Sequence, residues 1–220
     1  MFNIAVDGPG GAGKSTICKA VSKELGFIYV DTGALYRAVG LNALRNGIDT
    51  RNIDGITKML ETTDVNFAYV DGEQRVFLNG EDVSTDIRLP EASMAASNVS
   101  AIPVVRAFLL ELQQKIAREN DCLMDGRDIG TVILPNAQLK IFLTASAEVR
   151  AKRRFDELSA KGQKVNYDDI LADLNERDYQ DSHREIAPLK QADDAVLVDT
   201  SDMTFDEVKA TIIKLYEEKK

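Results

Sequence analysis

The sequence predicts an α/β fold, in which helices flank a five-stranded parallel sheet and a small antiparallel β insertion interrupts the chain. Along most of the chain, short apolar runs alternate with helical patterns, which is typical of βαβ units. Between Asp64 and Ile87 this alternation stops, and short β-rich runs are separated by Asp-Gly and Asn-Gly pairs. Both pairs tolerate the positive φ angles of tight hairpin turns. A chain of 220 residues is long enough for one core with a small inserted lobe.

The expected elements follow this pattern in order along the chain. The strands expected in the parallel sheet are 2–7, 27–31, Cys122–Gly126, 140–145 and 195–200. The helices expected are Lys14–Leu25, 33–45, a helix with an apolar stripe over 105–116, 148–159, 168–183 and a last helix ending near 217. Thr204 and Glu207 are spaced as a capping box at the start of that last helix. The insertion is expected to be a three-stranded meander of VNFAYV, RVFL and DVSTDI, with turns at Asp71-Gly72 and Asn79-Gly80.

Composition excludes several classes of protein. The formal net charge is −9, which argues against a general binder of nucleic acids or anionic membranes, because such surfaces need positive charge. No run approaches the roughly 18 apolar residues of a transmembrane helix. The segment MFNIAVDGPGG lacks the basic region and the cleavage site of a signal peptide. We therefore expect a cytoplasmic protein with neither nucleic-acid nor membrane partners.

The cysteine and histidine counts limit the chemistry further. Cys18 and Cys122 are far apart and form no C-x-x-C pair, so both are expected to be small buried side chains without a zinc or disulfide role. His183 is the only histidine, so any Ser-His or Cys-His mechanism would depend on that one residue. Catalysis is therefore expected to depend on charge and positioning.

A glycine-rich segment between the first strand and the first helix matches the pattern G-x-x-x-x-G-K-[ST]. Its glycines let the backbone N–H groups surround a phosphate chain, its lysine reaches the β- and γ-phosphates, and its serine hydroxyl can bind Mg²⁺. This P-loop predicts a nucleoside-triphosphate site. The residues expected to bind ATP here are Gly8, Pro9, Gly10, Gly11, Ala12, Gly13, Lys14, Ser15 and Thr16. The chain has no N-K-x-D segment of the kind that reads guanine in GTPases.

Arginines follow two further strands, at the sheet edge where ligands bind in open α/β folds. Arg37 lies in the helix after the second strand, and Arg127 directly follows the strand Cys122–Gly126. A guanidinium can donate two parallel hydrogen bonds to a phosphate. A single arginine is more often a solvated surface residue, but three strand ends at one edge favour a binding role.

Two helical segments carry further positive charge, and each allows two interpretations. Arg177, Asp181 and Arg184 are spaced i, i+4, i+7, which gives either one functional helix face or a surface ion-pair ladder. Upstream, Arg150, Arg153 and Arg154 share a helix face before the polar stretch 159–166. These residues form either a charged helix with a mobile loop or a lid that closes over a triphosphate.

Several longer segments together resemble one family over nearly the whole chain. They are DGPGGAGKST (7–16), DTGALYR (31–37), AASNVSAIPVVR (95–106), DGRDIGTVILPNA (125–137), KIFLTAS (140–146) and ERDYQDSHREIAPL (176–189). The sequence resembles the bacterial-type cytidylate kinases, which are P-loop nucleoside monophosphate kinases. The resemblance implies a P-loop three-layer sandwich with a helical lid, working as a monomer.

The resemblance also implies roles for particular residues. Residues expected to bind the cytosine base are Ser97, Arg106 and Asp128; near the ribose, Arg177 and Asp181; around the acceptor phosphate, Thr32, Arg37, Arg127 and Arg184. Besides the P-loop, ATP is expected to contact Arg150, Arg153 and Arg154. The catalytic residues would be Lys14, Arg127, Arg154 and Arg184, with Mg²⁺ held by Ser15 and, through water, by Asp125.

The expected function is ATP-dependent phosphorylation of CMP and dCMP, by direct in-line transfer with Mg²⁺, in pyrimidine nucleotide metabolism. Two alternatives stay open: a kinase for another small acceptor, such as UMP or a metabolite, and a non-catalytic nucleotide-binding regulator. The resemblance divides the single domain into a core of about 1–30, 100–150 and 185–220, an acceptor-binding region of about 31–99 and a lid of about 151–167.

Overall fold

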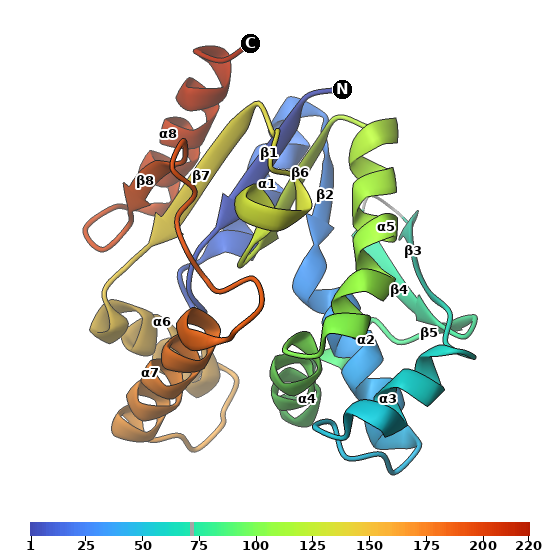
Figure 1. The fold of residues 1–220 in the computed structure, drawn as a ribbon. Coiled ribbons are helices and arrows are strands. Elements are labelled where there is room, and N and C mark those ends of the chain that lie inside the picture. The colour runs from blue at the N-terminus through green and yellow to red at the C-terminus, as the bar shows by residue number, and fades with distance from the viewer. Residues whose placement is uncertain (71–72) are drawn as a thin grey trace. The chain divides into compact units, whose positions relative to one another are not determined.

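The structure is a computed structural model that describes residues 1–70 and 73–220. The chain forms two compact units (Figure 1). The first comprises residues 1–29 and 120–220, and the second comprises residues 30–119. The expected division into core, acceptor-binding region and lid stays a prediction.

The strands of the parallel sheet are β1 (Asn3–Asp7), β2 (Ile28–Asp31), β6 (Cys122–Gly126), β7 (Leu139–Thr144) and β8 (Val196–Asp199). Their order across the sheet is β2-β6-β1-β7-β8, which confirms the predicted five-stranded sheet. β1 is central and pairs in parallel with β6 and β7 (Figure 1). In this register Asp7 lies opposite Gly126 on one side and Phe142 on the other. The loops that follow β1 and β6 therefore begin at the same edge of the sheet.

The helices of the first unit are α1 (Lys14–Leu25), α6 (Ala147–Ala160), α7 (Tyr167–His183) and α8 (Phe205–Glu217). α1 has the predicted bounds and ends at Gly26, which adopts the left-handed conformation typical of a helix C-cap. α8 begins with the predicted capping box of Thr204 and Glu207. α1 packs against α8 and β6, and α6 packs against α7. The core of this unit includes Ile4, Leu123, Ile141, Leu143 and Ile212.

The second unit contains α2 (Thr32–Arg45), α3 (Ile53–Leu60), α4 (Pro90–Ser100) and α5 (Pro103–Glu119). It also contains the antiparallel sheet of β3 (Val65–Val70), β4 (Glu73–Leu78) and β5 (Glu81–Asp82). α2 packs against α4 and against the sheet. This unit has a core of its own, which includes Leu35, Ile56, Ile87, Val99 and Leu109. The predicted β insertion is therefore confirmed.

Several local features differ from the sequence prediction. The third strand of the meander, expected over 82–87, is only Glu81–Asp82, because the Asp82 carboxylate accepts the N–H of Ser84 and the chain then turns into a 3₁₀ helix, Asp86–Arg88. The helices α3 and α4 were not predicted, nor was a one-turn π-helix at Ile129–Ile133. At the Asn79-Gly80 turn both residues have positive φ, 50° and 83°, as predicted. The expected Asp71-Gly72 turn lies outside the described residues.

Both cysteines are buried, as predicted, and neither forms a disulfide among the described residues. Burial raises the pKa of the Cys122 thiol to about 12. Within the part of the chain that the structure describes, no single helix has the length and apolar character needed to cross a membrane. The pair α4 and α5, with a bend of 101° between them, meets that criterion only when both are taken together.

Candidate nucleotide site

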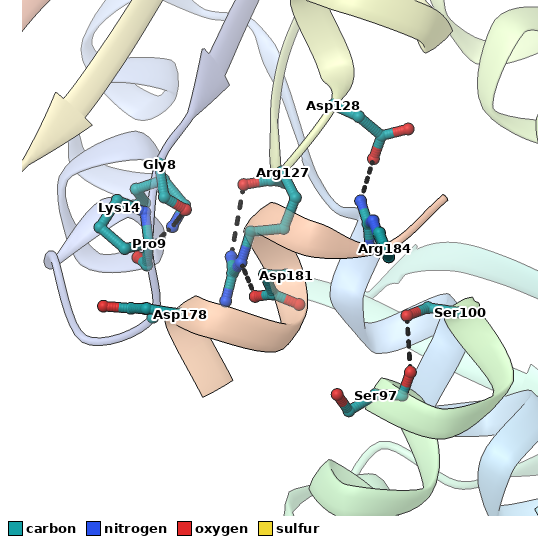
Figure 2. Close-up of polar contacts among 12 residues, drawn as sticks. Gly8, Pro9, Lys14, Ser97, Ser100, Arg127, Asp128, Asp178, Asp181 and Arg184 are labelled. Carbon is teal, nitrogen blue, oxygen red and sulfur yellow. Dashed lines mark hydrogen bonds and ion pairs between the residues drawn. The ribbon is translucent and has the colours of Figure 1, made fainter. Parts of the chain in front are cut away.

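The P-loop connects β1 to α1 through a tight backbone path. Gly8 has a φ of 147°, and a Cβ built on it would lie 1.9 Å from the backbone oxygen of Leu143 in β7. Only glycine fits this close approach between loop and strand. The buried Lys14 side chain folds back on the loop, where its Nζ donates hydrogen bonds to the carbonyl oxygens of Gly8 (2.6 Å) and Pro9 (2.8 Å) (Figure 2).

The ammonium group of Lys14 is electrostatically disfavoured in this position. Burial, followed by the positive charge of Arg127, lowers its pKa from the usual 10.5 to about 7. An anionic group bound in the loop would oppose both effects. A bound polyanion would therefore stabilise the charged form of Lys14.

Asp125, near the end of β6, connects the P-loop helix to β2. Its Oδ2 accepts a hydrogen bond from the Ser15 hydroxyl at 3.0 Å, and its Oδ1 accepts one from the Tyr29 hydroxyl at 2.9 Å. The structure thus brings together the two residues expected at a metal. No cluster of three or more His, Cys, Asp or Glu side chains suited to a metal occurs among the described residues.

Arg127 lies against the P-loop and is held by an acidic partner on α7. Its Nε donates to Asp181 Oδ2 at 2.8 Å (Figure 2). A Cβ built on Gly10 would lie 3.4 Å from Arg127 Nη2. Burial raises the pKa of Asp181, but the charges of Arg127, Arg177 and Arg184 outweigh it, so the pKa lies below its usual value. Asp181 is buried while Arg177 and Arg184 are partly buried, so the predicted Arg/Asp/Arg grouping is a partly buried cluster and not an exposed surface ladder.

Arg184 extends this cluster beyond the end of α7. The helix ends at His183, so Arg184 is its C-cap residue and does not continue the predicted helix face. Its Nη2 lies 3.4 Å from Asp128 Oδ1, and its Nε donates to the carbonyl oxygen of Ala187 at 2.6 Å (Figure 2). Both members of the Asp128–Arg184 pair are largely buried. The structure thereby places two predicted acceptor-binding residues in direct contact.

Arg150 lies beside the P-loop rather than on an open face. Its Nε donates to the Ala145 carbonyl and its Nη1 to the Gly10 carbonyl, both at 2.9 Å. Its Nη2 pairs with Asp178 of α7 at 2.6 Å. One buried guanidinium thus joins the end of β7, the P-loop and α7.

The other two arginines expected on this helix face point elsewhere. Arg153 donates to the backbone oxygen of Thr200 at 2.7 Å and to its hydroxyl at 3.1 Å. Arg154 is exposed and pairs with Glu157 at 2.8 Å. The three arginines of α6 therefore have different partners in this structure. Their roles toward ATP stay predictions.

The second unit contains a separate group of charges at the start of α2. The Asp31 carboxylate caps the helix by accepting the Ala34 N–H at 3.0 Å, next to the buried Thr32. It lies 3.3 Å from Arg88 Nη1 and 3.6 Å from Arg37 Nη1. Burial raises the pKa of Asp31, but these two charges hold it below its usual value. Arg37 Nη1 is buried and has no hydrogen-bond partner among the described residues, which suits an anion-binding role.

Two predicted base-binding residues lie on either side of the junction between α4 and α5. The Ser100 hydroxyl donates to the Ser97 carbonyl at 2.9 Å (Figure 2), and Arg106 Nη1 donates to the Ser100 carbonyl at 3.3 Å. The Arg106 guanidinium also lies over the ring of Tyr36, 5.8 Å from its centroid. Ser97 and Arg106 are thus linked through one residue between them.

Sequence reasoning missed several partners of these residues. Asp178, Arg88 and Tyr29 carry no motif of their own, and only the folded chain shows that they contact Arg150, Asp31 and Asp125. Asp7 was also missed, and its carboxylate accepts the backbone N–H groups of Ile129 and Gly130. It could have been identified, because a carboxylate at the end of an apolar strand, directly before the P-loop glycines, is unusual in a buried position.

Comparison with known proteins identifies similar chains. The family model described as cytidylate kinase matches residues 4–218. A curated cytidylate kinase of Caldicellulosiruptor bescii is 52% identical over 215 residues, which cover 98% of this chain and 95% of that protein. The cytidylate kinase of Lactobacillus johnsonii is 48% identical over 219 residues, covering 100% and 95%. A solved structure of an uncharacterised protein from Eubacterium ventriosum has a similar fold over the whole of both chains, with a TM-score of 0.53 at 12% identity.

Proposed function

The chain belongs to the cytidylate kinase family, and from this we propose that it transfers the γ-phosphoryl group of ATP to CMP and dCMP. The observation that supports this most directly is the placement of Arg127 beside the P-loop, in the same unit as Lys14. The two residues lie at the edge of the sheet where β1 and β6 end. A lysine for the triphosphate and an arginine for the transferred group are the cations that phosphoryl transfer needs.

The proposed reaction needs positioning and charge rather than a strong base. An oxygen of the CMP phosphate attacks the γ-phosphorus in line, and the bond from that phosphorus to the β–γ bridging oxygen breaks, which releases ADP. The attacking oxygen is already anionic, so no proton must be removed from it. Lys14 would leave the Gly8 and Pro9 carbonyls to bind the phosphates, and Arg127 would neutralise charge on the transferred group.

The residues around the P-loop serine are suited to Mg²⁺. A hydroxyl and a carboxylate, those of Ser15 and Asp125, lie 3.0 Å apart. Mg²⁺ in kinases takes oxygen ligands from one or two side chains, with water and substrate phosphates completing its shell. We propose that Ser15 ligates the ion and that Asp125 holds one of its waters. When bound, the ion would neutralise negative charge on the phosphate oxygens.

Each unit contributes its own candidates for the acceptor nucleotide. In the second unit, the proposed contacts are Arg37 and Thr32 for the phosphate and Ser97 and Arg106 for the base. In the first unit they are Arg127, Asp128, Arg177, Asp181 and Arg184, with the roles given above. The observations that support them are the buried donor on Arg37 and the buried Asp128–Arg184 pair.

A panel of acceptors tests the proposal. ADP release from ATP is measured with CMP, dCMP, UMP, AMP and GMP at equal concentration. We expect CMP or dCMP to give the highest kcat/KM. A cytidylate acceptor would be rejected if UMP gave an equal or higher kcat/KM. It would also be rejected if none of the five nucleotides raised ADP release above the rate with ATP alone.

Asp128→Ala is expected to reduce acceptor selectivity more than ATP affinity. A carboxylate that reads the base contributes a charge-assisted hydrogen bond, so its loss should lower the kcat/KM preference for CMP over UMP by about tenfold to a hundredfold. The change also removes the partner of Arg184, but that effect is common to all acceptors and cancels in the ratio. Asp194→Ala, which removes an exposed partner of Lys140, is the matched control. An unchanged ratio would remove Asp128 from base reading.

Binding of ATP is expected to take up a proton above neutral pH. With its pKa lowered to about 7, Lys14 is mostly neutral in the free protein at about pH 8, and a bound triphosphate restores its charge. At about pH 6 the lysine is already charged, so uptake should be small. Isothermal titration calorimetry in buffers of different ionisation enthalpy measures the difference. Lys14→Arg, which stays charged, gives the uptake due to ATP itself, and equal uptake by both proteins would contradict the prediction.

A further inference from the structure

Asp7 occupies a position at the carboxyl end of β1 that the proposed chemistry does not use. Its side chain is buried, and its two carboxylate oxygens accept one backbone hydrogen bond each. Oδ1 accepts the N–H of Ile129 and Oδ2 the N–H of Gly130, both at 2.7 Å. These two amides begin the π-helical turn that directly follows Arg127 and Asp128.

The segment that carries Arg127 and Asp128 is therefore fixed at both ends by β1. On one side, Gly126 pairs with Asp7 in the parallel sheet. On the other side, the Asp7 carboxylate holds the amides of Ile129 and Gly130. The two intervening residues cannot shift without breaking one of these contacts.

The packing around these amides leaves little room for movement. A Cβ built on Gly130 would lie 3.3 Å from Asp7 Oδ2 and 3.1 Å from Lys140 Cδ. Gly130 does not have positive φ, so an alanine there would be crowded by the Asp7 and Lys140 side chains and not strained by its backbone conformation. The close approach brings the amide to the carboxylate.

Stability alone does not account for a carboxylate in this place. Burial, together with the charge of Asp128, raises the pKa of Asp7 to about 6, although the two amides and Lys14 act in the opposite direction. The pKa in the folded chain thus exceeds the ordinary value of 3.8, so ionised Asp7 favours the unfolded state at neutral pH. An uncharged residue of similar shape would be less costly to bury.

We propose that Asp7 is a positioning residue for phosphoryl transfer, which places Arg127 and Asp128 by holding the backbone amides that follow them. This inference rests on the proposed function, because it assigns Asp7 an effect on acceptor binding and transfer. Asp7 itself touches neither nucleotide in this role. It acts on the acceptor side of the reaction, although it directly precedes the ATP-binding loop.

Asp7→Asn tests the proposal by keeping the shape and removing one acceptor. The Asn NH₂ group would face a backbone N–H, so one of the two contacts is lost. We expect kcat/KM for CMP to fall about tenfold or more, KM for ATP to stay within about twofold, and the thermal midpoint not to fall. The matched control is Asp121→Asn at the other end of the same strand pair, where the carboxylate accepts the Phe2 N–H at 2.6 Å. That variant should keep wild-type kinetics.

Gly130→Ala perturbs the same contact, between the Asp7 carboxylate and the Gly130 amide, at the amide. A methyl group there should push the amide away from Asp7, so the combined variant should lose less activity than the sum of the two single losses. Additive losses would show that the residues act separately and would overturn the proposal. An equal loss toward ATP and CMP would do the same, because it would assign Asp7 to the P-loop.

Amide hydrogen exchange provides a readout that does not depend on turnover. The Ile129 and Gly130 amides should exchange slowly in the wild-type protein and faster in Asp7→Asn, while the control stays slow. Unchanged exchange would overturn the positioning role. If the wild-type protein failed to phosphorylate any nucleotide, the proposed function would fail, and exchange would still test whether Asp7 holds the turn.

Discussion

Arg127→Ala is expected to lower kcat for phosphoryl transfer to CMP by about a thousandfold or more. ATP affinity should stay within about threefold of wild type. The physical reason for this separation is the coupling between Arg127 and Lys14. The charge of Arg127 is, after burial, the largest cause that lowers the Lys14 pKa. Its removal should raise that pKa, so Lys14 should be charged, and able to bind the triphosphate, over a wider pH range.

Steady-state kinetics and ATP titration of the same samples measure both effects. Arg118→Ala removes an exposed arginine that pairs with Glu111 and serves as the control. Arg127→Lys keeps the charge without the forked donors, so its kcat should lie between those of Arg127→Ala and Arg118→Ala. If Arg127→Ala lost ATP binding and turnover in parallel, or lost neither, the proposed role of Arg127 would be contradicted. A non-catalytic nucleotide-binding regulator would show no turnover in either the wild-type protein or the variant.

Gly8→Ala is expected to abolish ATP binding and to destabilise the fold. The new methyl group would lie 1.9 Å from the Leu143 backbone oxygen, an overlap that no rotamer change can relieve. The P-loop or β7 must move, and either movement breaks the backbone path that Lys14 and the loop amides follow. We expect at least about a hundredfold weaker ATP binding and a lower midpoint of thermal unfolding.

Gly26→Ala is the matched control for backbone strain. Gly26 also has positive φ, 71°, but a Cβ on it would have no atom within 4 Å. This variant should lose only the roughly 1 kcal/mol of a left-handed alanine and should bind ATP normally. If both variants behaved alike, strain in φ and not the contact with β7 would explain the Gly8 effect.

The sequence predicted best those elements whose signals are local. α1 has the predicted bounds, because a glycine-rich turn precedes it and Gly26 ends it. β6 also has the predicted bounds, since an apolar run leads into Asp125-Gly126. The capping box at Thr204 was visible as a spacing of three residues.

Elements that depend on tertiary contacts were not predicted. The buried residues of α4 are mostly small, and its first residue, Pro90, follows a position without a side-chain cap. It packs closely on α2, where a Cβ on Gly40 would lie 2.8 Å from Ala95 Cβ. The π-helical turn at Ile129–Ile133 likewise depends on Asp7, which is more than a hundred residues distant in the chain.

For the candidate site, residue types were more predictable than pairings. The P-loop, Arg127, Asp181 and Arg184 were identified from motifs and spacing, and the structure groups them in one unit. The partner of each charge was not predictable, because ion pairs such as Arg150–Asp178 join residues on different helices. Sequence spacing places residues on one helix face but does not identify the residues that pack against that face.

The three contacts of Arg150 affect how quickly a nucleotide leaves. Two of its nitrogens donate to carbonyl oxygens, and the third pairs with Asp178, so a phosphate could bind this guanidinium only by displacing that carboxylate. Asp178 then competes with the phosphate for Arg150 and pairs with it again when the phosphate dissociates. We expect this exchange to shorten the residence time of bound ADP. An internal carboxylate of this kind favours rapid product release over tight nucleotide storage.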